Sequence, residues 1–276
     1  MHGASDTGPH NPLFADAEAG TTERTGGADS WEPPAGLPDI YIAMGQTAEN
    51  VVLAENVSRE AMDEWGARSQ QRAVAAQERG FFDREITPVT LADGTVVSKD
   101  DGPRAGTTAE KLAELKPVFR PDGKVTAGNA CPLNDGAAAV VVMSDTRAEA
   151  LGITPLARIV SSSVTGLDPE IMGLGPVEAI RKALSRANMT IDDIDLVEIN
   201  EAFAAQVLPS MKHLNIDPEK LNVNGGAIAL GHPFGMTGAR IMTTLMNGLD
   251  DTGGRYGLES MCVGGGQGMA MVIERL

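Results

Sequence analysis

The sequence predicts an α/β protein: a mixed five-stranded sheet with helices on both faces forms its C-terminal half, after a mainly helical insert. Two observations carry this prediction. Beyond residue 137, short apolar runs rich in β-branched residues alternate with amphipathic helical stretches. The last two runs are joined only by Gly264-Gly265-Gly266-Gln267. This link is too short for a parallel crossover, so these strands must pair antiparallel.

The first part of the chain predicts helices around one small β element. Residues 1–40 show no sustained period and indicate an irregular lead-in. Two helices should follow and meet near Asn56, the second beginning at the cap Ser58 and ending at Gly80. The further elements expected here are strands at 86–89 and 95–98 around Asp93-Gly94, and a helix from the capping box Thr107-x-x-Glu110 to Leu115.

The rest of the chain predicts regular alternation. Ala137 to Met143 is a continuous small and β-branched run, typical of a strand buried on both faces, and a helix from Ser144 to Gly152 should follow it. The five strands of the sheet are expected at 155–163, 194–199, 221–224, 256–262 and 268–275, with helices at 176–187, 201–213 and 236–249.

Composition limits the possible functions. The 276 residues include 22 Lys and Arg against 38 Asp and Glu, a formal charge of −16 that disfavours nucleic acid and anionic membrane surfaces as partners. We find no apolar run of membrane-spanning length and no signal peptide, so we expect a cytoplasmic protein. The only cysteines are Cys131 and Cys262, too few for a disulfide scaffold.

Three polar clusters follow predicted strands, where an open α/β sheet binds its ligand. They are Asn200-Glu201-Ala202-Phe203, Gly231-His232-Pro233, and Cys262 with the glycines after it. His232 could be a functional group at a helix N-terminus or a buried turn residue, and Cys262 could face an oxyanion-binding loop or simply pack in the core.

Several common catalytic motifs are absent from the sequence. It has no phosphate-loop motif, no Gly-x-Ser-x-Gly and no His-Glu-x-x-His, and its four histidines and two cysteines make a poor metal set. These absences argue against a hydrolase and a metalloenzyme, and we expect no metal site.

Three longer stretches stand out: Asn200-Glu-Ala-Phe-Ala-Ala-Gln206, Asn224-Gly-Gly-Ala-Ile-Ala-Leu-Gly-His-Pro233 and Cys262-Val-Gly-Gly-Gly-Gln-Gly-Met-Ala270. With these motifs, the chain resembles the thiolase family of acetyl-CoA acetyltransferases and 3-ketoacyl-CoA thiolases, from about residue 40 to its end. Two shorter stretches fit this family as well: Met44-Gly-Gln-Thr-Ala-Glu-Asn50 and Gly128-Asn-Ala-Cys-Pro-Leu-Asn-Asp-Gly136.

The resemblance implies a thiolase fold, and coenzyme A as a substrate with no further cofactor. The reaction it implies is either Claisen condensation or thiolytic cleavage of a 3-ketoacyl-CoA. By this resemblance, His232 is the base that activates a thiol and Cys262 the acid/base at the substrate α-carbon. Asn200 would hold a water that, with His232, binds one thioester oxygen, and the Gly264 N–H would serve a second oxyanion hole.

The same resemblance implies four residues that bind CoA. Arg104 would lie near the nucleotide phosphates, with a surface arginine as the alternative, and Met44 and Phe203 would line the pantetheine tunnel, with ordinary core residues as the alternative. Cys131 stands where many relatives have a serine that touches pantetheine.

In relatives, the nucleophilic cysteine lies in an N-terminal half-domain, and neither cysteine of this sequence matches it. We therefore expect a chain that lacks this half: an insert over 1–133, a strand and helix of the missing half over 134–153, and the C-terminal domain over 154–276. Such a chain would be inactive alone. The alternatives are a thiolase whose N-terminal half is a separate chain and a non-catalytic CoA-binding or interaction protein. Relatives are usually homo-oligomers, so we expect one for the intact enzyme.

Overall fold

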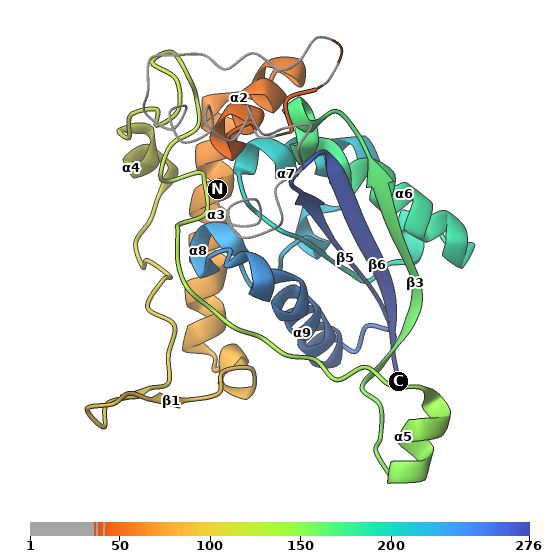
Figure 1. Cartoon of the computed structure of the whole chain (residues 1–276). Coiled ribbons are helices and arrows are strands. Elements are labelled where there is room, and N and C mark those ends of the chain that lie inside the picture. The colour runs from red at the N-terminus through yellow and green to blue at the C-terminus, as the bar shows by residue number, and fades with distance from the viewer. Residues whose placement is uncertain (1–35, 37, 41) are drawn as a thin grey trace.

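A computed structural model describes residues 36, 38–40 and 42–276 of the chain. The lead-in expected over 1–40 lies almost entirely outside these residues. Figure 1 shows a twisted sheet with helices packed against it and a long helix, α3, beside it.

The central sheet is mixed, as predicted. It contains β3 (Ala157–Gly166), β4 (Leu196–Ile199), β5 (Tyr256–Val263) and β6 (Gln267–Arg275), in the order β3-β6-β5-β4. Strand β4 runs parallel to β5, whereas β6 is antiparallel to both β3 and β5. The predicted hairpin of the last two strands is therefore confirmed.

The prediction of a fifth strand at 221–224 is wrong. Leu221 makes a single parallel bridge to Val197, and the chain then turns at Asn222, whose φ is 48°. The Asn222 side chain takes the place of a further strand: its Oδ1 accepts from the Ile199 N–H and its Nδ2 donates to the Ile199 carbonyl, each at 2.9 Å. A side-chain amide offers the same donor and acceptor as a peptide group, so the backbone need not continue the ladder.

Helices cover both faces of the sheet. Successive strand residues point to opposite faces, and this divides the core in two. Val197 and Ile199 pack with α6 (Gly175–Ala187) and α7 (Ala204–Leu214), whereas Leu196 packs with Leu245 and Leu249 of α9 (Phe234–Thr252). Five short helices connect these parts: η3 (Pro169–Leu174), η4 (Ile191–Asp193), η5 (Pro218–Lys220), α8 (Ala227–Leu230) and η2 (Phe81–Arg84).

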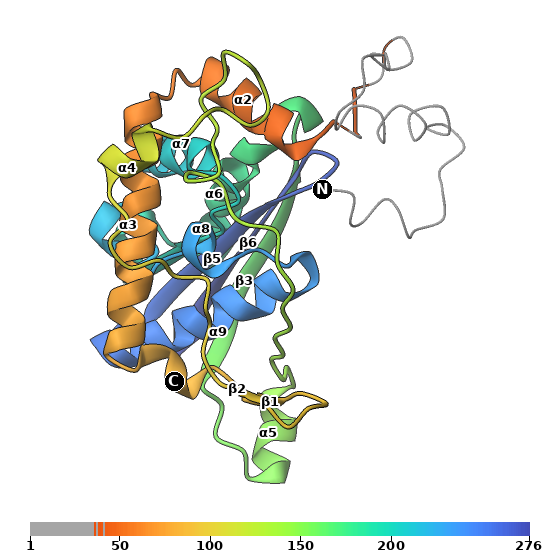
Figure 2. The ribbon, with the colours of Figure 1, turned by 90° about the vertical axis from the view of Figure 1, so that its left-hand side faces the viewer.

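The two helices predicted to meet near Asn56 are present. Helices α2 (Met44–Ala54) and α3 (Arg59–Glu78) meet at Asn56, and the Ser58 hydroxyl caps α3 by accepting from the Ala61 N–H. Figure 2 shows α3 running lengthwise beside α7 and α8. The β hairpin shrinks to β1 (Val89–Thr90) and β2 (Val96–Val97), and α4 (Ala109–Ala113) is capped by Thr108 rather than Thr107.

Within residues 134–153, the predicted helix is confirmed and the predicted strand is wrong. Helix α5 (Asp145–Leu151) begins after the predicted cap Ser144 and ends at Gly152 in the left-handed conformation. Residues 137–143 form no strand, and Val141 and Val142 are 84% and 68% exposed. Among the described residues, no backbone group forms a hydrogen bond with the backbone of residues 137–143. A buried strand needs both a ladder partner and covering side chains, and β propensity supplies neither.

Candidate active site

The parallel strands β4 and β5 end side by side, and two predicted catalytic residues lie at these ends. Asn200 directly follows β4, and its N–H donates to the Ser260 carbonyl of β5 at 3.0 Å. Cys262 lies two residues further along β5, on the face covered by α6 and α7. The carboxyl ends of parallel strands are where open α/β sheets bind ligands.

Gln206 joins these two residues. It lies in the first turn of α7, is 1% exposed, and its Nε2 donates to the Asn200 carbonyl at 2.7 Å. Its Oε1 accepts from the Cys262 thiol at 3.1 Å. Because one end of the amide must donate and the other accept, these contacts fix its orientation and direct the thiol proton toward Gln206.

The Asn200 side chain is buried without a partner. The residue is 1% exposed, and within the described part of the chain neither Oδ1 nor Nδ2 makes a hydrogen bond. Each such buried polar group costs about 1–3 kcal/mol, so native structures rarely keep one without a reason. A polar ligand group at this place would give the amide the partner it lacks.

Glu201 ties the site to the insert. Its buried carboxylate accepts from Trp65 Nε1 (3.1 Å) and Ser69 Oγ (2.6 Å) of α3, and from Asn222 Nδ2 (2.8 Å) and the Ile228 N–H (3.3 Å). These four donors satisfy the carboxylate. Through it, the loop after β4, the turn at Asn222 and the start of α8 are held against helix α3.

His232 lies on the connection between α8 and α9, after a tight turn. Gly231 has a φ of 85°, and a Cβ there would overlap the Asn134 amide, so only glycine fits. Asn134 Oδ1 accepts from the His232 N–H at 3.1 Å, and the ring packs edge-on against Phe234 at 5.1 Å between centroids. Burial, assisted by the charge of Arg240, lowers the pKa of His232 to about 4, so the imidazole is neutral at pH 7.

Both thiols are protonated in this environment. Burial raises the pKa of Cys262 to about 12 and that of Cys131 to about 11. The backbone brings Cys131 next to the segment that follows β4. Cys131 reaches this region because its N–H donates to the Ala202 carbonyl at 3.0 Å.

Gly264 opens the turn between β5 and β6, next to Cys262. It is exposed, and no heavy atom lies within 4 Å of where a Cβ would stand. Gly266 closes the turn with a φ of 82°, and its carbonyl accepts from the Leu167 N–H at 2.8 Å. The turn is thus anchored on one side while Gly264 faces open space.

The residues predicted to bind CoA lie around this region without forming one cluster. Phe203 is half-buried before α7 and packs edge-on against Phe119 at 6.1 Å, and Phe119 in turn covers Gly45, next to Met44. Arg104 is exposed, and its N–H donates to Gln70, whose Nε2 donates to the Ile228 carbonyl of α8. Arg104 is therefore connected to the His232 segment through its backbone.

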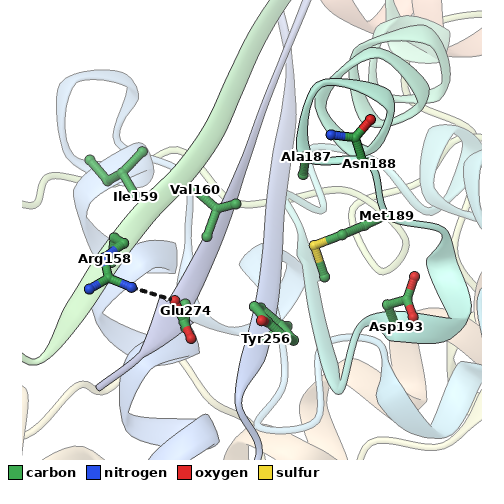
Figure 3. Close-up of a pocket in the computed structure, with 9 residues that line it drawn as sticks. All are labelled: Arg158, Ile159, Val160, Ala187, Asn188, Met189, Asp193, Tyr256 and Glu274. Atoms are coloured by element: carbon green, nitrogen blue, oxygen red, sulfur yellow. Dashed lines mark hydrogen bonds and ion pairs between the residues drawn. The ribbon is translucent and has the colours of Figure 1, made fainter.

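A hollow of about 440 Å³ lies elsewhere, at the opposite end of β5. Figure 3 shows Arg158 paired with Glu274 on the neighbouring strand at one side of it, and Met189 and Asp193 at the other side. It contains none of the predicted site residues. Within the described residues, no group of three His, Cys, Asp or Glu side chains could hold a metal ion, and no helix is long and apolar enough to cross a membrane.

Two family models match the chain and together cover most of it. The model of the thiolase C-terminal domain matches residues 153–275, and that of the thiolase N-terminal domain matches residues 19–146. The chain belongs to the thiolase family. It carries matched residues of both thiolase domains, so the N-terminal domain is represented here.

Curated and solved thiolases are similar along the same stretch. An acetyl-CoA acetyltransferase of Chromobacterium violaceum is 50% identical over 246 residues, which cover 87% of this chain and 63% of that protein. A beta-ketoadipyl-CoA thiolase of Acinetobacter baylyi is 49% identical, over 84% of this chain and 60% of that one. This thiolase chain thus spans about 60% of the length of these relatives.

Solved thiolase structures confirm the predicted thiolase fold. The crystal structure of the Bacillus anthracis acetyl-CoA acetyltransferase superposes with a TM-score of 0.83 at 53% identity, over 85% of this chain and 60% of that one. Human mitochondrial 3-ketoacyl-CoA thiolase in complex with CoA gives 0.81 at 45% identity, over 86% of this chain and 60% of that one.

Sequence reasoning missed three residues of this candidate site. Gln206 is the last residue of the Asn200 motif and lies three positions after the helix cap Phe203. Thr237, five positions after His232, forms a hydrogen bond with the His232 ring. Asn134 accepts through its side chain from the His232 N–H. Spacing within the helix could have indicated the first two, but nothing local in the sequence connects Asn134 to His232, since 98 residues separate them.

Proposed function

We propose that this chain supplies the proton-transfer and CoA-binding groups of a thiolase, an acetyl-CoA C-acyltransferase that condenses acyl-CoA units or cleaves a 3-ketoacyl-CoA. The observation that carries the proposal is the buried, unpartnered Asn200 amide, joined through Gln206 to the Cys262 thiol. A thioester oxygen, or a water that binds one, would satisfy this amide while the thiol faces the adjacent α-carbon.

In the cleavage direction, a thiol attacks the 3-keto carbon and gives its proton to His232. The bond between the α- and β-carbons then breaks, and its electron pair moves onto the thioester enolate. Cys262 gives its S–H proton to the α-carbon, which releases acetyl-CoA, and in condensation the same proton moves back. A neutral imidazole and a protonated thiol are the forms that these steps require at pH 7.

The first experiment measures two activities of the purified chain. Acetyl-CoA incubated in D2O should exchange its α-protons, followed by mass spectrometry, because this step needs only the groups described here. CoA binding is measured in parallel by calorimetry. Absence of both binding and exchange would refute the proposal.

A second candidate, a CoA-binding protein without turnover, is favoured by one observation: the pKa values of both thiols are raised. A nucleophilic cysteine needs the opposite shift. We therefore propose that neither cysteine of this chain forms an acyl-enzyme by itself. Acetylation of Cys131 or Cys262 by acetyl-CoA, detected by peptide mass spectrometry, would contradict this.

The finer parts of the proposal stay predictions. They are coenzyme A as a substrate with no resident cofactor, a role in fatty acid β-oxidation, a cytoplasmic location and a homo-oligomeric enzyme.

A further inference from the structure

In the part of the chain that the structure describes, one side chain forms a hydrogen bond with the His232 ring. Its Nδ1 lies 2.7 Å from the hydroxyl oxygen of Thr237, which is fully buried in the first turn of α9. The same hydroxyl oxygen lies 2.9 Å from the Pro233 carbonyl oxygen. The imidazole, the hydroxyl and the carbonyl therefore form a short chain of hydrogen bonds.

The positions of the protons in this chain follow from the number of donors. A threonine hydroxyl has one proton to donate, and a carbonyl oxygen can only accept. If the hydroxyl donated to His232, its oxygen would face the Pro233 oxygen at 2.9 Å with no proton between them. The hydroxyl must therefore donate to Pro233 and accept from His232, so that the imidazole proton is on Nδ1.

We propose that Thr237 is a positioning residue that holds His232 in the tautomer with its proton on Nδ1, so that Nε2 is the nitrogen able to accept a proton. The role of Nε2 as a base rests on the proposed function, whereas the tautomer does not.

The fold supports this arrangement from the backbone. Pro233 is the N-cap of α9, and its carbonyl also accepts from the N–H groups of Met236 and Thr237 at 3.0 and 3.1 Å. The acceptor of the hydroxyl proton is thus fixed by the helix start. When a thiol proton moves to Nε2, a thiolate and an imidazolium form, and the Nδ1–H bond to Thr237 persists throughout.

The experiment is nitrogen NMR of the chain labelled with ¹⁵N-histidine at pH 8, with the His232 signals assigned through a His232→Gln variant. Long-range proton–nitrogen correlations distinguish the protonated ring nitrogen from the unprotonated one. We expect a single neutral form protonated on Nδ1. A form protonated on Nε2, or a rapidly exchanging mixture, would overturn the proposal.

Two variants test whether Thr237 is the cause. Thr237→Ser keeps the hydroxyl and should keep the Nδ1–H form, whereas the nearly isosteric Thr237→Val should lose it. An unchanged tautomer in Thr237→Val, with the fold verified by circular dichroism, would refute the role of Thr237. Because this signal needs neither CoA nor turnover, an Nδ1–H tautomer in a chain that does not bind CoA would refute the proposed function alone.

Discussion

At the scale of single residues, the two cysteines have the same chemical state for the same reason. Cys262 is buried and Cys131 is half-buried, and Cys262 also donates its proton to Gln206, an acceptor that cannot stabilise a thiolate. The acid form is therefore the resting form of Cys262, as a residue that protonates a carbon requires.

We predict that Cys262 resists alkylation. In a Cys131→Ser background, iodoacetamide should modify it at least about a hundredfold more slowly than free cysteine at pH 8, because the thiolate is the reacting species and burial raises the pKa of this thiol to about 12. Peptide mass spectrometry over a pH series measures the rate. A plateau below pH 9 would contradict the assigned acid form.

Removal of the two proton-transfer groups should abolish most of the chemistry. We expect His232→Ala and Cys262→Ala each to lower α-proton exchange of acetyl-CoA by about a hundredfold or more, within the usual range for general acid–base groups. CoA affinity should change little, and this is checked by calorimetry. Near-normal exchange in either variant would remove that residue from the mechanism.

At the scale of elements, Glu201 holds three segments together. Its neighbours are all donors, so Glu201→Gln would direct an NH2 group against other donors while keeping size and shape. We expect a loss of roughly 1–3 kcal/mol in unfolding free energy, measured by urea denaturation.

A matched control is Glu219→Gln. Glu219 also carries two partners, Arg68 and Arg72, but its side chain is 72% exposed, and exposed ion pairs contribute little. Its stability should stay close to that of the unchanged chain. Equal losses in both variants would contradict the role given to Glu201.

The sequence could predict those elements whose signals are local. Caps and periodicity located most helices and strands, because Ser58, Ser144 and Gly152 act on adjacent residues. The strand at 221–224 was mispredicted because Asn222 replaces a ladder through its side chain, which apolar pattern does not reveal.

For the site, candidate catalytic residues could be named from their motifs, but their contacts with one another could not. The link between Gln206 and Cys262 spans 56 residues, and that between Glu201 and Trp65 spans 136. Such contacts exist only once the insert has packed on the sheet, so no local pattern encodes them. The strand predicted at 137–143 is wrong for a related reason, because the pairing of a strand is not a local property of the sequence either.

At the scale of the whole molecule, two buried carboxyl groups should make stability depend on pH. Glu198 and Glu259 are register partners on β4 and β5, and burial raises the pKa of each to about 8, against the opposing effect of Arg240. The folded chain therefore keeps protons that the unfolded chain releases above pH 4.5. This contribution to stability is complete below pH 4.5 and is lost as the pH rises through 8.

We expect the unfolding free energy to fall by roughly a few kcal/mol between pH 5 and pH 9, measured by urea denaturation. Glu259→Gln, which is neutral at every pH, should reduce this slope and be more stable than the unchanged chain at pH 9. An identical pH profile in the variant would show that Glu259 does not retain its proton.

The side-chain amide of Asn222 also affects whether the sheet can pair with another chain. A sheet that ends in a free strand exposes a row of unpaired peptide groups, which is a template for adding a strand from another chain. Beyond β4, Leu221 and then the Asn222 amide occupy these positions, and both peptide groups of Ile199 are engaged by a side chain that cannot extend further. Leu221 and Asn222 thus protect this edge of the sheet from pairing with a strand of another chain, at the place where the loop that leads to His232 begins.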